Sequence, residues 1–63
     1  MPTIHRIDDE FTISFETTDI ELDASIGSFI RKFSIASNIK VEDRKMTAYT
    51  LEGKFITSFS WED

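Results

Sequence analysis

Few residues of this chain could carry acid–base or nucleophilic chemistry. His5 is the only histidine, the side chain best suited to proton transfer near neutral pH. A nucleophilic triad would need a serine beside His5 and a carboxylate behind it, but no serine lies in a nucleophile-elbow motif. The two glycines, Gly27 and Gly53, are too far apart for a phosphate-binding glycine loop. We therefore expect a protein that is not an enzyme.

Metal and cofactor sites are also poorly supported by the residue types. The chain has no cysteine and one histidine, whereas zinc sites usually draw on several such ligands. A calcium loop needs spaced Asp or Asn positions and a turn glycine, which the run Asp8, Asp9 and Glu10 lacks. We expect neither a metal nor a cofactor.

Charge and hydropathy narrow the class of partner. Twelve acids against seven bases give a net charge of −5, which disfavours direct binding to nucleic acid or membranes, because both attract Lys and Arg. A nucleic-acid binder would have to use the bases between Arg31 and Lys45, together with Tyr49. No apolar run reaches the length of a membrane span, and the first residues lack the pattern of a signal peptide. A cytoplasmic location is the expectation.

Hydrophobic periodicity predicts the fold class. Apolar and polar residues alternate in residues 11–16 and 55–61, which is typical of strands. Between them, an apolar stripe recurs every three or four residues, as on one face of a helix: Leu22, Ile26, Phe29, Phe33 and Ala36. We predict one α+β domain over residues 1–63, a small antiparallel sheet of two hairpins with one helix packed on one face, in the order ββαββ.

The first hairpin is expected to join strands at residues 3–7 and 11–16 through a turn at 8–10. Two registers are open. A two-residue loop sets Ile4 beside Ile13, whereas a three-residue loop sets Ile7 beside Phe11. We prefer the second register, because it pairs Ile7 with a large apolar side chain.

The helix and the last strands follow from local signals. Thr18 and Glu21 match a capping box at the helix start, and Asp23 is a second possible N-cap. Asn38 suits the left-handed end of a helix running to about residue 37. Residues 39–41 form either a short strand or an extended connector. Residues 46–51 and 54–61 then form a hairpin around Glu52 and Gly53.

The second hairpin is predicted to carry apolar residues on both faces. If Leu51 faces Lys54, Tyr49 faces Ile56 on one face. The larger apolar set lies on the other face: Met46, Ala48, Phe55, Phe59 and Trp61. One helix covers only one face, so Tyr49, Leu51 and Ile56 are predicted to form an exposed contact surface. The alternatives are scattered apolar side chains of no function, or side chains covered by sheet curvature.

The helix is expected to bury the larger apolar set. The predicted core joins Ile26, Phe29, Ile30 and Phe33 of the helix to Phe11, Ile13, Phe15, Phe55 and Phe59 of the sheet.

Residues 8–23 contain seven acids and no base. Turns and helix starts ordinarily collect acids, and that accounts for several of them. It accounts less well for Asp8, Asp9, Glu10 and Glu16, which we predict to form a docking edge for a basic protein surface.

These features predict a small acidic, non-enzymatic protein-binding module. Proteins this small, acidic and free of cysteine resemble, in general character only, phage or mobile-element inhibitors of host nucleic-acid-processing proteins. The alternative function is a structural homodimeric subunit whose acids are solvated surface. Salt dependence of binding distinguishes the two, because binding steered by acids weakens with salt and apolar dimerisation does not.

Overall fold

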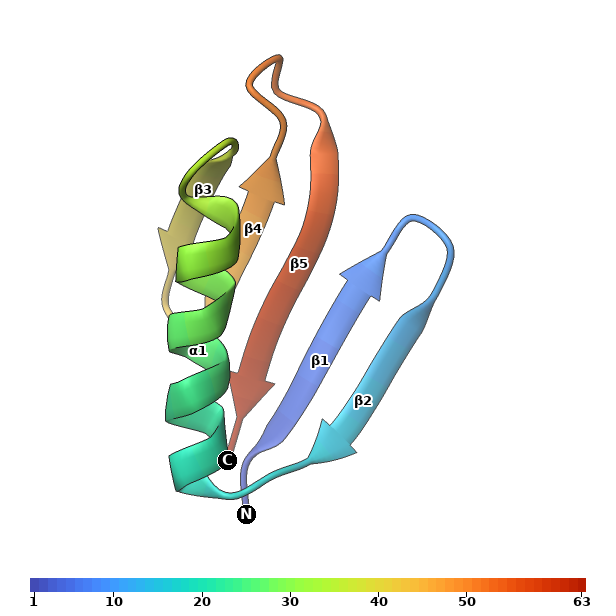
Figure 1. Cartoon of the computed structure of the whole chain (residues 1–63). Coiled ribbons are helices and arrows are strands. Elements are labelled where there is room, and N and C mark those ends of the chain that lie inside the picture. Colours follow the sequence, from blue (N-terminus) through green and yellow to red (C-terminus); the bar gives the residue numbers. More distant parts are fainter.

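The computed structural model describes residues 1–63 as one sheet and one helix. The elements are β1 (Thr3–Asp8), β2 (Thr12–Glu16), α1 (Asp19–Phe33), β3 (Asn38–Glu42), β4 (Lys45–Tyr49) and β5 (Phe55–Glu62). The sheet has five strands in the order β2-β1-β5-β4-β3, and all neighbouring strands are antiparallel (Figure 1). The predicted α+β class is confirmed, and residues 39–41 belong to a strand, β3.

Pairing of the first strand with the last joins the two hairpins into one sheet. Ile4 lies opposite Phe15 of β2 on one side and opposite Trp61 of β5 on the other. The two chain ends therefore lie close together at the same end of the sheet (Figure 1). Strands β2 and β3 are the two edges.

Thr18 caps the helix N-terminus, as the capping-box pattern predicted. Its Oγ1 accepts a hydrogen bond from the Glu21 N–H at 3.2 Å. The Glu21 carboxylate does not return to the cap residue. It instead accepts a hydrogen bond from the Thr17 hydroxyl at 3.0 Å, which ties the helix start to the end of β2.

The helix ends earlier than the sequence predicted. Ser34 is the C-cap, and its N–H donates to the Ile30 carbonyl at 2.9 Å. Asn38 does not take a left-handed conformation, because it is already the first residue of β3. The chain needs the intervening residues to turn back from the helix to the sheet edge.

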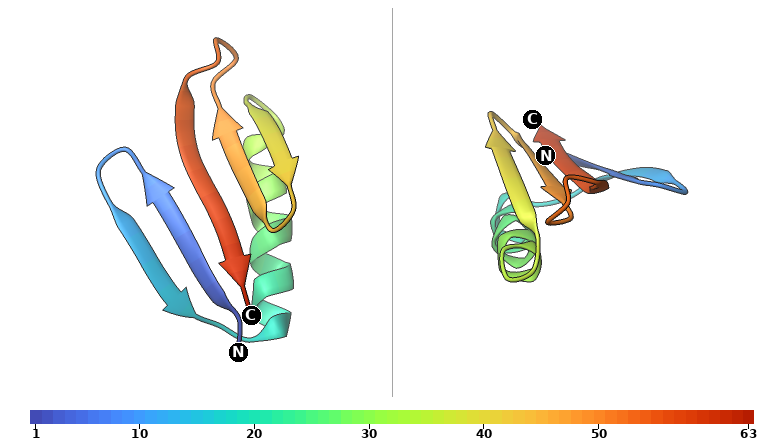
Figure 2. Two further views of the ribbon diagram at one scale, coloured as in Figure 1. Left: turned by 180° about the vertical axis from the view of Figure 1, so that it is seen from behind. Right: turned by 90° about the horizontal axis from the view of Figure 1, so that it is seen from above.

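The core lies between α1 and the half of the sheet formed by β3, β4 and β5 (Figure 2). The Phe29 ring stands 4.7 Å from the Phe33 ring and 5.6 Å from the Phe59 ring, centroid to centroid. The buried apolar residues are Ile4, Leu22, Phe29, Met46, Ala48 and Phe59. Ile26 and Phe33 are partly buried against them, so this part of the predicted core is confirmed.

The rest of the predicted core is exposed, and that prediction is wrong. Ile30 and Phe55 are about 40% exposed, and no side chain of β2 is buried. A helix is about 10 Å across and strands lie about 4.8 Å apart, so one helix covers two or three strands. The five-stranded sheet therefore leaves β2 without a cover, whereas Ile4 of β1 still reaches the core.

Neither register considered for the first hairpin occurs. Ile4 pairs with Phe15 and Ile7 with Thr12, because Asp9 and Glu10 form a two-residue loop one position later than expected. Asp8 therefore ends β1 as a strand residue, rather than opening the turn.

The second hairpin has the expected register away from its tip and a different one at the tip. Met46 pairs with Phe59, as predicted. Thr50 and Lys54 close a three-residue loop in which Gly53 has φ +90°, in place of the predicted two-residue loop. Between Tyr49 and Ala48 the pairing returns to the predicted register through an irregularity of the kind that a β-bulge produces.

The only helix is too short and too polar to span a membrane.

Candidate functional site

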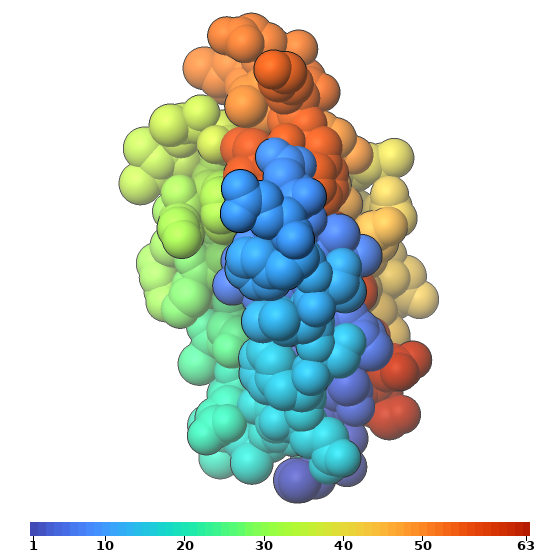
Figure 3. Space-filling model, turned by 90° about the vertical axis from the view of Figure 1, so that its right-hand side faces the viewer, coloured from blue at the N-terminus to red at the C-terminus, as the bar shows by residue number.

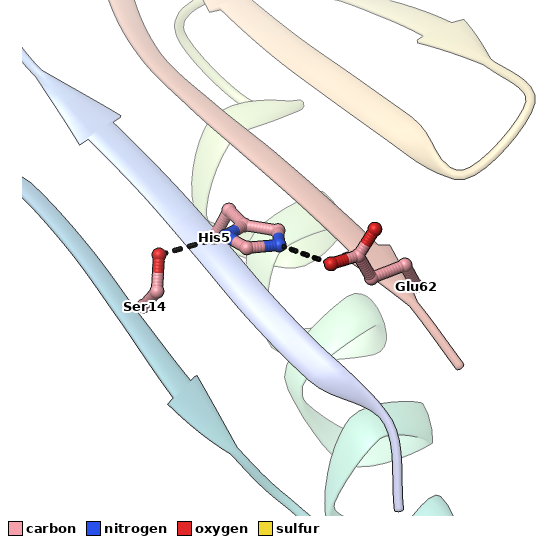
Figure 4. Close-up of polar contacts among 3 residues, drawn as sticks. All are labelled: His5, Ser14 and Glu62. Carbon is pink, nitrogen blue, oxygen red and sulfur yellow. Dashed lines mark hydrogen bonds and ion pairs between the residues drawn. The ribbon is translucent and has the colours of Figure 1, made fainter.

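His5 lies in a polar row on the sheet face away from the helix. Its Nδ1 is 2.7 Å from the Ser14 Oγ, and its Nε2 is 3.2 Å from the Glu62 Oε1 (Figure 4). The three residues come from neighbouring strands, β2, β1 and β5, with His5 in the middle. The order serine–histidine–carboxylate is that of a nucleophilic triad.

The surroundings of this row do not resemble those of a hydrolytic site. None of the three residues lines a pocket. Nucleophilic catalysis on a carbonyl also needs walls that hold the substrate and donors aimed at the oxyanion. An imidazole held between two polar neighbours on a sheet surface is sufficiently explained as cross-strand pairing. Sequence reasoning missed the contact because the strand order that creates it was unknown.

The structure does not bring Tyr49, Leu51 and Ile56 together. Ile56 is partly buried and packs against the core instead of facing Tyr49, which pairs with Phe55. Leu51 lies in the turn at the hairpin tip and is 72% exposed. The extra loop residue and the irregularity near Tyr49 separate the three side chains.

The four predicted docking acids lie at the two ends of β2. Asp9 and Glu10 are exposed in the β1–β2 turn, and Glu16 is exposed at the opposite end of the strand. Asp8 is partly buried, and its carboxylate accepts a hydrogen bond from the Thr57 hydroxyl. Asp8 is therefore occupied within the fold, and the other three acids are exposed at the two ends of the strand.

Between these acids, β2 and the residue before it present a row of large apolar side chains. Phe11, Ile13 and Phe15 are 52%, 43% and 47% exposed, respectively. Ile13 and Phe15 share the helix-side face of the sheet with Phe59, which packs on the helix. Figure 3, which looks onto the outer edge of β2, shows no other segment in front of that edge. We call these three side chains the β2 row.

An open groove of about 290 Å³ lies between Phe15, at one end of the β2 row, and the helix. Its floor and walls are largely apolar or small, including Phe15, Phe59, Ala24 and Ser28. Arg6 also lines it. The Arg6 Nε is buried without a hydrogen-bond partner, and Arg6 makes no ion pair. No acceptor within the chain satisfies this donor.

The backbone of β2 is unpaired along its outer side. The Asp8 N–H donates to the Phe11 carbonyl, and the Thr17 N–H donates to the Pro2 carbonyl, each at 2.9 Å. In an antiparallel ladder, residues face the partner strand alternately. The N–H and C=O groups of Thr12, Ser14 and Glu16 therefore point away from β1, toward solvent.

The β2 row was predicted to be part of the core. Its exposure could have been anticipated only by comparing the width of one helix with the width of the sheet. Five strands under one helix leave part of the apolar face open, but the sequence does not say which strands lie outside.

Comparison with family models, with curated proteins and with solved structures found no match to this chain.

Proposed function

We propose that this chain is a non-enzymatic protein-binding module that docks onto a basic protein through β2 and the β2 row. The observation that carries the proposal is the run of three half-exposed large apolar side chains on, and just before, an uncovered edge strand. Exposed apolar patches rimmed by polar residues mark interaction surfaces. This surface replaces the predicted cluster of Tyr49, Leu51 and Ile56, whose members are separated.

Charge supports a basic partner. Asp9, Glu10 and Glu16 flank the β2 row, and the chain carries a net charge of −5. Complementary charge speeds encounter and excludes wrong partners. A protein that processes nucleic acid presents such a basic surface, and a small acidic module that occupied it would act as an inhibitor.

The test is capture from a cell lysate with the immobilised chain and two matched variants. Ile13→Thr shortens the β2 row, whereas Ile35→Thr makes the same change at an 88% exposed residue outside it. The parent and Ile35→Thr should retain the same protein, and Ile13→Thr should lose it. Retention should fall as salt is raised.

Equal retention by Ile13→Thr would overturn the proposal. A stable dimer in sedimentation, dissociated by Ile13→Thr and accompanied by no captured protein, would establish the homodimeric subunit instead.

A further inference from the structure

We propose that the partner contributes an extended segment that adds to β2 as a sixth strand, with apolar residues at alternate positions and Lys or Arg at both ends. This inference rests on the proposed function, and it names the form and chemistry of what binds. β-Strand addition draws affinity from main-chain hydrogen bonds and specificity from alternate side chains.

The outer edge of β2 has no neighbouring strand. Its outward N–H and C=O groups belong to Thr12, Ser14 and Glu16, and no residue between Thr12 and Glu16 is charged. Natural proteins usually protect an exposed edge with charges, proline or a bulge. No bulge or proline interrupts β2. Its edge is therefore open to an additional strand.

An added strand would lie beside alternating polar and apolar side chains of β2. Residues opposite Thr12 and Ser14 would direct their backbone groups to β2 and their side chains to the polar sheet face. Residues opposite the β2 row would direct their side chains to the helix side of the sheet, and the one opposite Phe15 would lie beside the groove. The matching segment therefore alternates polar and apolar residues.

Acidic residues lie at both ends of the β2 row. Asp9 and Glu10 precede the β2 row, Glu16 follows it, and no base lies among them. A segment spanning the row in either direction therefore meets carboxylates at both of its ends. Lys or Arg at these positions would pair with them.

The same acids disfavour a second copy of the chain on this edge. With Ile13 on the two-fold axis, Glu10 of each copy would lie opposite Glu16 of the other. With Ser14 on the axis, the Asp9–Glu10 turn would run beside the acidic helix start at Asp19. Like charges set opposite each other destabilise a strand pair.

The probe is the blocked peptide Lys-Lys-Val-Thr-Val-Thr-Val-Lys-Lys, titrated by calorimetry. Its charge-reversed form, with Glu in place of every Lys, should bind at least tenfold more weakly. N-methylation of the two Thr residues removes the N–H groups directed at β2 and should weaken binding at least tenfold. N-methylation of the outer two Val residues removes N–H groups directed at solvent and should change binding less than threefold.

Variants of the chain give the reciprocal test. Ser14→Pro removes one outward N–H that the fold does not use, and proline is tolerated at such edge positions. Ser14→Ala is the matched control, because it loses the same hydroxyl and keeps the N–H. Ser14→Pro should weaken peptide binding at least tenfold relative to Ser14→Ala, with circular dichroism confirming that both fold.

Equal effects of the two N-methylation patterns would overturn strand addition, whether or not Ser14→Pro folds. So would failure of the parent chain to bind the lysine peptide more tightly than the glutamate peptide. If Ile13→Thr still abolishes capture, either of these results rejects strand addition but leaves the proposed protein-binding function standing. Failure of the strand-addition proposal can therefore be distinguished from failure of the proposed function.

Discussion

The two halves of the sheet differ in what covers them. The half built from β3, β4 and β5 lies under α1, and Met46, Ala48 and Phe59 on it are buried. In the half built from β1 and β2, Ile4 of β1 is buried, but β2 carries similar apolar alternation and is exposed along its whole length. Apolar alternation alone therefore identifies a strand with an apolar face without saying that the face is buried in the same chain.

The two edge strands of the sheet also differ, in the charges that they carry. Edge strand β3 carries an ion pair between Lys40 and Glu42, with 3.3 Å between Nζ and Oε1. Edge strand β2 has no charge before its last residue, Glu16. Charges on an edge oppose pairing with another chain, so β3 is protected against strand addition and β2 is not.

The largest loss of stability should come from a substitution in the core between the helix and the covered half of the sheet. Phe29 is 5% exposed and lies between the rings of Phe33 and Phe59. Phe29→Ala should cost about 3–5 kcal/mol of unfolding free energy in urea denaturation, close to the whole stability of a small domain. Phe33→Ala should cost less, because Phe33 is only partly buried. The reverse ranking would place the core elsewhere.

Local sequence patterns predicted the covered half of the molecule better than the uncovered half. The periodicity of Ile26, Phe29 and Phe33 identified the helix face, because helical spacing is a local property. The exposure of Phe11, Ile13 and Phe15 depends on strand order, which is set by the pairing of β1 with β5, about fifty residues apart. No local pattern contains that pairing.

Unexpected loop lengths explain the other incorrect predictions, which concern the registers of the two hairpins. One extra residue in the loop that ends at Gly53 moves Ile56 out of register with Tyr49, and one residue in the first turn changes every pair of that hairpin. The contact of His5 with Ser14 and Glu62 follows from the actual registers, so it could not be predicted either.

A smaller loss of stability is expected at the N-terminus of the helix, which follows β2 in the chain. Thr18→Ala removes the N-cap acceptor of the Glu21 N–H and should cost about 1 kcal/mol. The same change at Thr12, which is exposed on β2 and makes no side-chain hydrogen bond, is the matched control. Thermal melting of both should show the larger loss for Thr18→Ala. Equal losses would mean that the cap adds nothing to stability.

The smallest effect on stability should come from the β2 row itself. Ile13→Thr should change the unfolding free energy by only about 0.5–1 kcal/mol, because its side chain is 43% exposed and no side chain of β2 is buried. Urea denaturation measures this value on the same variant used for capture. A loss of several kcal/mol would show that the β2 row is core, and the loss of capture would then reflect unfolding.

Amide hydrogen exchange, measured residue by residue with and without the lysine-flanked peptide, tests the central claim most directly. In the free chain, the outward amides of Thr12, Ser14 and Glu16 should exchange fast, while those of Ile13 and Phe15 are protected by β1. The peptide should slow exchange at Thr12 and Ser14 and leave β3 unchanged. Protection gained along β3, or none gained along β2, would contradict the account.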